Sequence, residues 1–476
     1  MQKNYRKAIN EQIDSEMLAR MVKQRLFGTS GIRGIFNVDL APKLALQVGL
    51  ALATYTNSGE IVIGHDTRFS SPLLEHSVIS GLLAGGANVH KLGLTPTPVL
   101  AFLTRELKAD AGVMITASHN PPEYNGIKLF NSDSTAYNKE EEKEIEEVVN
   151  KKSFNRSTWR EIKTHTPIDE THRYLEAVCK VVELERRWRV ILDPGCGATC
   201  DVAPALFRML GCKVTAVNSQ PDGFFPGRSP APEPEALQSL CEVVKQLHAD
   251  IGIAYDGDGD RMVLIDEKGV LAPLDQTLAA YAGYLVKKHK GGVVVTTVEA
   301  SMCLEEMIEP LHGKVVRTKV GDVAVATATR RHKAIFGGEP CGAWIHPQHH
   351  WCPDGILSSA LLLKALEDEN RKLSSLISEV PHYSILREKL PCPNSSKSVV
   401  IKDLEKKLPT VYPEKEEEST IDGIRLTLKN GWILVRPSGT EPLIRVTVEA
   451  KSAEEAEKIM EKGLKQVKKS VGETIN

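Results

Sequence analysis

Three stretches of the chain repeat one hydrophobic pattern: a short β-branched run, a polar loop, apolar residues at helical spacing and a second β-branched run. The repeats begin at Ile61–Gly64, Arg189–Leu192 and Val293–Val295. Short helices between strands require crossover connections, and therefore a largely parallel or mixed sheet. The pattern predicts three related α/β domains, whose helices and second strands are Leu73–Leu83 and Asn88–Leu92, Val202–Leu210 and Lys213–Val217, and Cys303–Ile308 and Lys314–Arg317.

The C-terminal part follows a different pattern. Ile424–Leu428 alternates between apolar and polar residues, a hairpin-turn signal follows at Lys429–Gly431, and two more apolar runs read as strands, Trp432–Val435 and Leu443–Glu449. Ser452 and Glu455 then form the sequence signature of a capping box before a long charged helix. This part is predicted to be a small α+β domain. Two charged runs are interpreted as solvated surface. Glu414–Glu418 is expected to be a loop, and Lys139–Asn150 is expected to be a surface helix.

The size of the chain fits several domains rather than one. At the usual ~100–200 residues per domain, its 476 residues predict about three or four. We expect an N-terminal extension with an added helix (1–25) and four domains at 26–165, 166–268, 269–380 and 381–476. The net charge of −2 argues against a nucleic-acid or membrane-surface partner, but it leaves room for a local basic pocket that binds a small anion.

Targeting signals and cysteine spacing point to one compartment. The sequence lacks both a run of ~20 apolar residues, which a membrane helix needs, and an apolar signal core near its start. Its nine cysteines are scattered without a CxxC pair, which favours reduced thiols over a disulfide framework or a zinc site. We therefore expect a cytoplasmic protein.

The segment Thr116–Pro121 is the first candidate for chemistry. It follows the apolar strand Ala111–Ile115, so Ser118 is expected in a loop at the carboxyl end of a strand, where α/β sheets bind ligands. A serine in that place can act as a nucleophile or phosphate carrier. The alternative is an ordinary polar turn, because Ser, Asn and Pro all favour turns.

The segment Asp256–Arg261 is the second candidate. Three carboxylates alternate with glycines after the strand Ile251–Tyr255, so their oxygens can converge on a hard cation such as Mg²⁺. An EF-hand calcium loop is less favoured, because Arg261 replaces the glycine of its sharp turn and Met262–Ile265 reads as the second strand of a hairpin. A metal-free acidic turn is disfavoured because unpaired carboxylates repel one another.

Two further loops complete the set. Arg436–Pro442, with Arg445 after it, combines hydroxyls, flexible backbone amides and two guanidiniums into a phosphate cradle, although an ordinary strand connection remains an alternative. Gly337–Gly342 carries Glu339 on a glycine-rich loop suited to a pair of sugar hydroxyls, but as a lone motif it is more easily read as an ordinary loop.

Two other motifs are set aside. Gly195–Cys200 resembles a dinucleotide fingerprint but lacks the third glycine. The histidines His346, His349 and His350 are interpreted as a solvated loop in preference to a metal site. The remaining pieces, a serine, a hard-cation loop and a separate phosphate cradle, predict phosphoryl transfer to a substrate that is anchored at a second point.

These motifs resemble those of the α-D-phosphohexomutase family, which includes phosphoglucomutase/phosphomannomutase and phosphoglucosamine mutase. The similarity extends from Leu26 onward in the family's order. It begins at the signature Phe27–Gly34 and continues through the phosphoserine, metal, sugar and phosphate loops: Thr116–Pro121, Asp256–Arg261, Glu339–Gly342 and Arg436–Thr440.

The resemblance implies a heart-shaped enzyme of four domains that interconverts hexose 1-phosphate and hexose 6-phosphate through phospho-Ser118 and a hexose 1,6-bisphosphate. It implies one Mg²⁺ per chain, bound by Ser118 as its phosphoserine and by Asp256, Asp258 and Asp260. The expected catalytic residues are Ser118, His119, Lys128 and Arg33. The expected substrate-binding residues are Arg261, Gly321, Asp322, Glu339, Cys341, Arg436, Ser438, Gly439, Thr440 and Arg445. A monomer or homodimer is expected.

Departures from the family pattern bear on the sugar. Cys341 stands where serine is usual, Ala343 where histidine is frequent, and His65 where arginine is common. We expect glucose or mannose phosphates as substrates, with glucosamine phosphate a close second. A non-catalytic sugar-phosphate-binding scaffold and a metal-dependent phosphatase are the competing functions. An intact Ser118 argues against the scaffold, and a second phosphate cradle argues against the phosphatase.

Overall fold

The computed structural model describes residues 26–28, 30–439 and 441–475, so the helix expected within residues 1–25 lies outside the described part. The described chain forms two compact units. The first unit holds the residues up to Leu271 together with Ala343–Leu373, and the second holds Ala272–Gly342 and the residues from Ser374 onward. Among the described helices, none combines the length and the apolar character that a membrane crossing requires.

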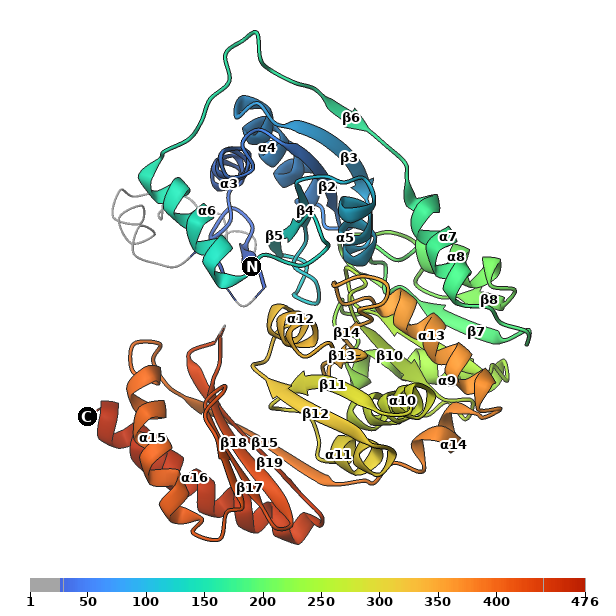
Figure 1. The fold of residues 1–476 in the computed structure, drawn as a ribbon, viewed down its shortest axis with the longest axis vertical. Coiled ribbons are helices and arrows are strands. Elements are labelled where there is room, and N and C mark those ends of the chain that lie inside the picture. The colour runs from blue at the N-terminus through green and yellow to red at the C-terminus, as the bar shows by residue number, and fades with distance from the viewer. Residues whose placement is uncertain (1–25, 29, 440, 476) are drawn as a thin grey trace. The chain divides into compact units, whose positions relative to one another are not determined.

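The first sheet of the first unit has six strands in the order β1-β5-β4-β2-β3-β6 (Figure 1). The pairs β1/β5 and β5/β4 are antiparallel, and the remaining pairs are parallel. The strands are β1 (Ile32–Ile35), β2 (Glu60–His65), β3 (Asn88–Leu94), β4 (Ala111–Ile115), β5 (Tyr124–Asn131) and β6 (His165–Pro167). The accompanying helices are α3 (Pro42–Tyr55), α4 (Ser71–Ala84), α5 (Thr97–Glu106) and α6 (Lys139–Lys151).

The second sheet repeats the central plan of the first. Its order is β10-β9-β7-β8, with the hairpin pair β10/β9 antiparallel and the other pairs parallel, as for β5-β4-β2-β3. Its strands are β7 (Arg189–Asp193), β8 (Lys213–Ala216), β9 (Ile251–Tyr255) and β10 (Met262–Ile265). Its helices are α7 (Thr171–Val181), α8 (Val202–Met209), the short η1 (Pro234–Leu237) and α9 (Gln238–Gln246). The predicted repeat of mixed α/β domains is confirmed.

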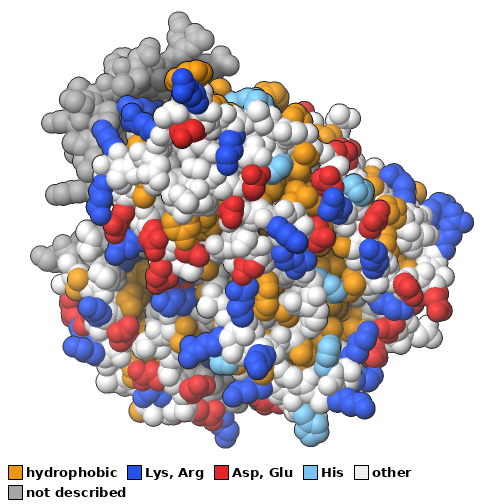
Figure 2. Space-filling view, turned by 45° about the horizontal axis from the view of Figure 1, so that its top comes forward, with side chains coloured by type: hydrophobic (Ala, Val, Ile, Leu, Met, Phe, Trp, Pro, Cys, Tyr) orange, Lys and Arg blue, Asp and Glu red, His pale blue; other side chains and the backbone are white. Residues whose placement is uncertain are grey.

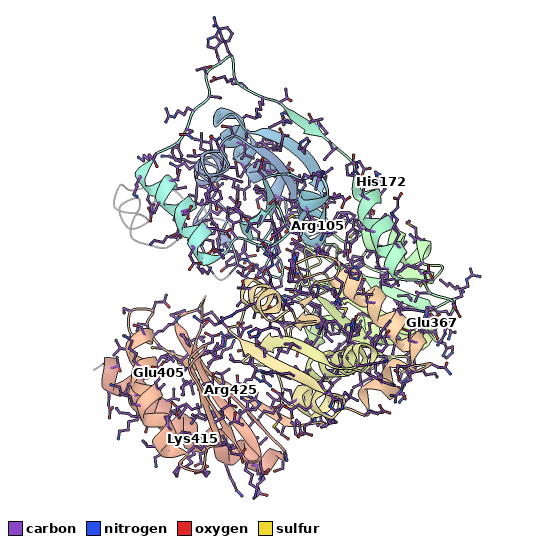
Figure 3. The ribbon with its side chains drawn as sticks, in the orientation of Figure 1. Arg105, His172, Glu367, Glu405, Lys415 and Arg425 are labelled. Carbon is purple, nitrogen blue, oxygen red and sulfur yellow. The ribbon has the colours of Figure 1, made fainter. Side chains whose placement is uncertain are left out.

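A late segment of the chain returns to the first unit. It contains β14 (Trp344–Ile345) and α13 (Gly355–Asp368), and α13 lies beside the green elements of the second sheet in Figure 1. Glu367 near the end of α13 accepts hydrogen bonds from Trp188 Nε1 (3.1 Å) and from the backbone N–H of Glu185 (2.6 Å); Figure 3 labels this residue. These bonds join residues that are some 180 positions apart.

The second unit combines a parallel sheet with an antiparallel one. The parallel strands are β12 (Gly313–Thr318), β11 (Gly292–Thr297) and β13 (Phe336–Gly338), with α10 (Leu274–His289), α11 (Cys303–Ile308), η2 (Glu309–Leu311) and α12 (Asp322–Arg331). The antiparallel sheet follows the order β15-β19-β18-β17-β16. Its elements are β15 (Ser384–Pro391), β16 (Glu417–Ser419), β17 (Ile424–Leu428), β18 (Gly431–Pro437), β19 (Leu443–Ala450), α15 (Lys397–Val411) and α16 (Ala453–Ile475). The short α14 (Leu373–Ile377) precedes β15.

The C-terminal α+β prediction is confirmed with one correction. The run Glu414–Glu418 was interpreted as a loop, which was wrong for its last two residues. Glu417 and Glu418 belong to the edge strand β16, which pairs with β17. Exposed acidic side chains suit an edge strand, since like charges discourage pairing with another chain. Buried apolar residues from both sheets, Val298, Trp432 and Leu434, pack together inside the second unit.

The surface agrees with the near-neutral net charge. On the face that Figure 2 shows, basic and acidic side chains are interspersed with apolar patches, and neither sign of charge gathers into a large area.

Candidate active site

Ser118 lies in a tight loop between β4 and β5. It is fully buried and has φ +52°, a left-handed conformation that non-glycine residues seldom adopt. Its N–H donates to Thr116 Oγ1 at 2.9 Å, and its hydroxyl donates to Asp256 Oδ2 at 2.7 Å. The predicted serine and the predicted acidic loop are therefore in direct contact, although 138 residues separate them in the sequence.

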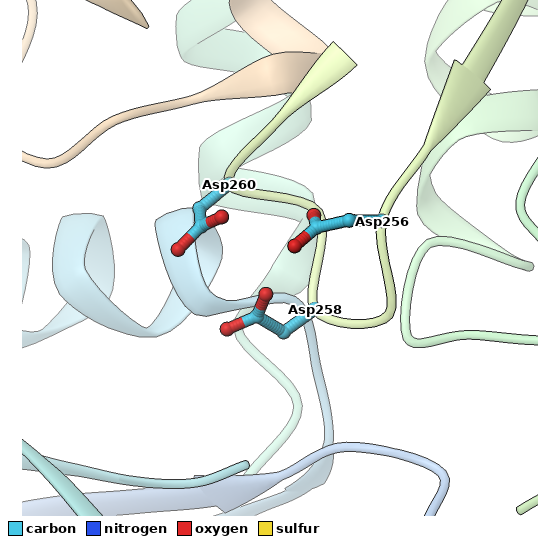
Figure 4. Close-up of side chains that lie close together, drawn as sticks. All are labelled: Asp256, Asp258 and Asp260. Atoms are coloured by element: carbon cyan, nitrogen blue, oxygen red, sulfur yellow. The ribbon is translucent and has the colours of Figure 1, made fainter. Parts of the chain in front are cut away.

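The acidic loop joins β9 to β10, as the sequence predicted. Asp256, Asp258 and Asp260 point their carboxylates toward a common centre (Figure 4), and one oxygen from each lies within 4.8 Å of the others. Asp256 Oδ1 accepts the backbone N–H groups of Gly259 (3.1 Å) and Arg261 (3.2 Å), which closes the turn. A Cβ on Gly257 would stand 2.5 Å from the carbonyl oxygen of Ser118, so only glycine lets the two loops approach.

The carboxylates suit a cation. Oδ1 of Asp258 and Oδ1 of Asp260 are both buried, and neither has a hydrogen-bond partner among the described residues. Burial, and then the neighbouring Asp260 and Asp258 charges, raise the pKa of Asp256 well above its ordinary value. A buried cluster of this kind gains most from a divalent ion with oxygen ligands, so these residues can hold such a metal.

Lys128 on β5 partly neutralises the cluster. Its Nζ lies 2.7 Å from Asp258 Oδ2 and 2.8 Å from Asp260 Oδ2. Burial alone would lower the pKa of Lys128, but the two carboxylates outweigh it and raise the pKa above its usual range. Burial would likewise raise the pKa of Asp258, but Lys128, with a hydrogen bond from Thr97 (2.6 Å), lowers it below its ordinary value. Lys128 is therefore a fixed positive charge at physiological pH.

His119 and two arginines surround the serine. His119 Nδ1 lies 3.3 Å from Ser118 Oγ, and the charge of Arg261, followed by burial and the charge of Arg33, lowers the pKa of His119 to about 2. The ring is consequently neutral at physiological pH. Arg33 donates to Asn120 Oδ1 at 3.0 Å, and Arg261 Nε lies 3.8 Å from Asp260 Oδ1. The first unit therefore brings together all of its expected site residues.

The second unit joins two of the predicted sugar-contacting loops. Glu339 is 8% exposed, and its Oε2 accepts the backbone N–H of Gly321 at 3.0 Å. Gly321 has φ +127° and comes directly before α12, which begins at Asp322. Cys341 is half-buried in the same loop as Glu339. The roles expected of these residues stay predictions.

The phosphate loop belongs to the antiparallel sheet of the second unit. Arg436 at the end of β18 pairs with Glu299 Oε1 at 2.6 Å, and Arg445 on β19 pairs with Glu441 Oε2 at 2.5 Å. Ser438 Oγ accepts the N–H of Glu441 at 3.2 Å. Gly439 is exposed in the turn, and the predicted ligand Thr440 lies outside the described residues. Two guanidiniums and a hydroxyl therefore gather at one turn, a set of donors that suits phosphate.

Sequence reasoning missed two residues that organise the phosphate loop. The Lys397 ammonium, from the start of α15, donates to the carbonyls of Ser438 (2.7 Å) and Glu441 and so holds the phosphate loop in shape. Glu299, the partner of Arg436, was also missed. Both were missed for one reason: a single charged residue far from the motif carries no local pattern that would reveal its partner.

The solvated-loop interpretation was wrong for two of the three histidines, since His349 is partly exposed. His346 and His350 are 3% and 2% exposed, and their Nε2 atoms bond to Ser358 Oγ and Asp354 Oδ2, each at 2.9 Å. Asp354 also caps α13 by accepting the N–H of Leu357. In the described part of the chain, the three aspartates are the group of side chains able to hold a metal.

Four models of one protein family match the chain. They are the phosphoglucomutase/phosphomannomutase α/β/α domains I, II and III, at residues 24–156, 172–269 and 273–383, and the C-terminal domain of that family, at residues 389–465. The chain belongs to the phosphoglucomutase/phosphomannomutase family. It is accordingly an isomerase that acts as an intramolecular phosphotransferase, as predicted.

Curated relatives in this family are named as phosphoglucosamine mutases. A probable phosphoglucosamine mutase of Pyrococcus abyssi is 47% identical over 94% of this chain and 98% of its own length. A phosphoglucosamine mutase of Methanocaldococcus jannaschii is also 47% identical, over 94% of this chain and 99% of its own. These names favour the second-ranked sugar of the sequence analysis over the first.

Solved phosphoglucomutase/phosphomannomutase-family structures share the fold. A family protein from Burkholderia thailandensis superposes with a TM-score of 0.85 at 26% identity, covering 94% of this chain and 98% of that one. The N-acetylphosphoglucosamine mutase of Aspergillus fumigatus, in complex with GlcNAc-6P and magnesium, gives a TM-score of 0.60 at 17% identity over 98% of this chain and 99% of that one. The second likeness concerns the fold alone.

One buried carboxyl of the second unit makes stability depend on pH. Asp275 accepts the N–H of Ser301 at 2.8 Å, but burial dominates and raises the pKa of Asp275 to about 6. Between about pH 4 and pH 6 the folded protein keeps a proton that the unfolded chain has already lost, so this contribution to stability is lost as pH rises. Relative to Asp275→Asn, the wild type should lose about 2–3 kcal/mol of unfolding free energy between about pH 4 and 7. Urea unfolding of both proteins at the two pH values measures this; an equal change in both would contradict it.

Proposed function

We propose that the protein is a phosphoglucosamine mutase, which interconverts glucosamine 6-phosphate and glucosamine 1-phosphate through a phosphoserine at position 118 and glucosamine 1,6-bisphosphate. The contact between Ser118 Oγ and Asp256, at the centre of three convergent carboxylates, carries the phosphoryl-transfer part of the proposal. The names of relatives at 47% identity support the choice of sugar.

The transfer moves one phosphoryl group in each direction. In the first half, the bond between phosphorus and Ser118 Oγ breaks while a bond between phosphorus and a sugar hydroxyl oxygen forms, and the proton that the sugar hydroxyl loses is balanced by the one that Ser118 Oγ gains as it becomes a hydroxyl. In the second half, the other phosphoryl group of the bisphosphate returns to Ser118 Oγ. Because Ser118 is buried and its backbone N–H donates to Thr116 Oγ1 in a bond that phosphorylation does not remove, the residue keeps its position through both halves.

Charge neutralisation is the main task of the surrounding residues. Asp256, Asp258 and Asp260 would hold a magnesium ion, which would supply positive charge against the oxygens of the transferring phosphoryl group. Lys128 stays protonated between two carboxylates, so it acts as a fixed positive charge rather than as a base. Arg33 and Arg261 add positive charge at the rim. His119 is neutral and close to the serine oxygen; because its pKa is lowered to about 2, its ring can take part in a hydrogen bond there but is a poor acceptor of a proton.

The phosphate loop holds the phosphate that does not react. The planar, positively charged guanidiniums of Arg436 and Arg445, together with the hydroxyl of Ser438, donate hydrogen bonds to this phosphate. Each end of the sugar can take this place in turn. The loop at Glu339 and Gly321 contacts the hydroxyls of the ring.

Replacing Arg436 with glutamine should raise KM far more than it lowers kcat. A hydrogen bond to a charged group is worth about 1.5–3 kcal/mol, which corresponds to a rise in KM of about 10- to 100-fold. Initial rates over a range of glucosamine 1-phosphate measure the two constants. Arg187→Gln, a change at an exposed arginine of the first unit, serves as the control. An unchanged KM in the Arg436 variant would remove the phosphate-binding role from this loop.

The sugar is tested by comparing the 1-phosphates of glucosamine, glucose and mannose under the same conditions, with Mg²⁺ and a bisphosphate primer. We expect the highest kcat/KM for glucosamine 1-phosphate. A higher value for glucose or mannose would overturn the choice of sugar and leave the phosphoryl-transfer proposal in place. Release of inorganic phosphate in excess of isomerisation would instead identify a phosphatase.

A further inference from the structure

A buried ion pair lies beside the serine loop. Asp66 and Arg68, which follow β2, are both fully buried, and Arg68 Nε donates to Asp66 Oδ2 at 3.0 Å. The four remaining N–H groups of the guanidinium point at backbone carbonyls 2.5–3.0 Å away, those of Ser118, Asn120, Pro121 and Tyr124. All five donors are used by the protein itself, so Arg68 has none left for a substrate.

The carboxylate of this pair holds the same loop from its other side. Thr116 Oγ1 donates to Asp66 Oδ2 at 2.7 Å and accepts the N–H of Ser118 at 2.9 Å. The pair thus reaches both the N–H and the C=O of Ser118. A non-glycine residue in the left-handed conformation is strained and persists only where its surroundings hold it there, and these bonds do so.

A second pair of the same kind lies beside the acidic loop. Asp193 is the last residue of β7, and Arg228 Nε donates to its Oδ2 at 2.9 Å. Arg228 also donates to the carbonyls of Asp193, Ser229 and Tyr255, at 2.9, 2.9 and 2.6 Å. Tyr255 ends β9 directly before Asp256, so this arginine anchors the start of the acidic loop.

The discarded motif at Gly195–Cys200 serves this second pair. Gly195 has φ +58°, and a Cβ there would stand 2.5 Å from Arg228 Cζ. Glycine both adopts the turn and leaves room for the guanidinium. The N–H of Ala198 donates to the carbonyl of Gly257 at 2.9 Å, which attaches this turn to the acidic loop. Its glycines therefore have a positional function in place of nucleotide binding.

The two pairs occupy equivalent places in the repeated sheets. β2 lies next to β4, which leads into the serine loop, and β7 lies next to β9, which leads into the acidic loop. In each domain an aspartate at the carboxyl end of the neighbouring strand fixes an arginine, and the arginine binds carbonyls at the next loop. The segment that carries Arg228 also contacts the first pair. Phe225, three residues before Arg228, packs its ring on Arg68, with 5.3 Å between Arg68 Cζ and the ring centroid.

We propose that Asp66–Arg68 and Asp193–Arg228 are one positioning device used twice, the first pair fixing the nucleophilic serine and the second fixing the metal-binding carboxylates. The assignment rests on the proposed function. Lysine keeps the positive charge of arginine but lacks its planar set of five donors. An Arg→Lys change should therefore loosen the loop that the arginine holds while keeping the charge that balances the buried aspartate. Each pair should then affect a different measurable quantity.

The test uses Arg68→Lys and Arg228→Lys, each as the control for the other, with the exposed Arg173→Lys as a neutral reference. The rate of Ser118 phosphorylation by a hexose 1,6-bisphosphate at saturating Mg²⁺ is followed by quenched intact-mass analysis. Mg²⁺ affinity is measured by calorimetry on the dephosphorylated proteins. Arg68→Lys should slow phosphorylation by about 10- to 100-fold with little change in Mg²⁺ affinity, because misplaced reacting atoms cost about that much. Arg228→Lys should weaken Mg²⁺ binding by about 10-fold and leave the phosphorylation rate nearly unchanged.

A loss of packing would affect both quantities alike. Parallel changes in both variants, or no change in either, would therefore overturn the proposal. Asp66→Asn and Asp193→Asn provide the same comparison if a lysine variant does not fold. A wild-type protein that never becomes phosphorylated on Ser118 would contradict the proposed function instead, and the calorimetric comparison would still test the second pair.

Discussion

Ser118→Ala is expected to lower mutase turnover by about 10⁴-fold or more, because no other group can take over the covalent step. Among the residues that the structure describes, Ser118 Oγ is the hydroxyl that donates to Asp256 at the centre of the three carboxylates. The variant should fold, since the change removes one oxygen and leaves the backbone bonds to Thr116 and Arg68 in place.

Three measurements define this result. A coupled assay with glucosamine 1-phosphate gives turnover, and circular dichroism gives the fold. Intact-mass analysis should find one phosphoryl group on the wild type after treatment with a hexose 1,6-bisphosphate, and none on the variant. Ser80→Ala, in the exposed part of α4, is the matched control and should behave as wild type. Substantial turnover by Ser118→Ala would exclude a phosphoserine mechanism.

Asp258→Asn should have the next largest effect, on metal binding. This carboxylate is fully buried. In the described part of the chain its Oδ1 has no hydrogen-bond partner, while its Oδ2 accepts hydrogen bonds from Lys128 and Thr97. The change removes one charged ligand and leaves Lys128 with Asp260 alone. We expect Mg²⁺ affinity to fall by at least about 10- to 100-fold, the range seen even for residues that act indirectly on a metal.

Calorimetric titration with Mg²⁺ measures this loss without reference to activity. Asp201→Asn, a change at an exposed aspartate at the start of α8, is the control and should keep wild-type affinity. In a parallel experiment, chelation of all divalent ions should stop turnover and added Mg²⁺ should restore it. Unaltered Mg²⁺ affinity in Asp258→Asn, or full turnover in the presence of chelator, would place the metal elsewhere or remove it from the mechanism.

The local pattern of the sequence was sufficient for the elements and for the order of the motifs. Alternating and β-branched runs predicted the strands on both sides of Ser118 and of Asp256, because strand formation depends on residues within a few positions. The Ser452–Glu455 pair predicted the start of α16, and Ser452 Oγ accepts the N–H of Glu455 at 3.3 Å. Each of these features depends only on residues that are close together in the sequence.

Long-range partners could not be predicted in this way. The family resemblance proposed that Ser118 and the aspartates share one site, but it did not indicate that Lys128 would bridge Asp258 and Asp260. It also did not indicate that His346 and His350 would be buried against α13. A polar residue in a loop looks the same in the sequence whether water or a distant side chain satisfies it.

Residue spacing along the chain therefore decided the strands, the helices, the turns and the types of side chain available for chemistry. The folded sheets alone decided that Arg68 would fix the serine loop, some 50 residues further along the chain, and that Arg228 would fix the start of the acidic loop. The physical reason is that secondary structure follows from local periodicity, whereas an arginine reaches the carbonyls of a distant loop only where the order of strands in a sheet brings the two segments to the same edge.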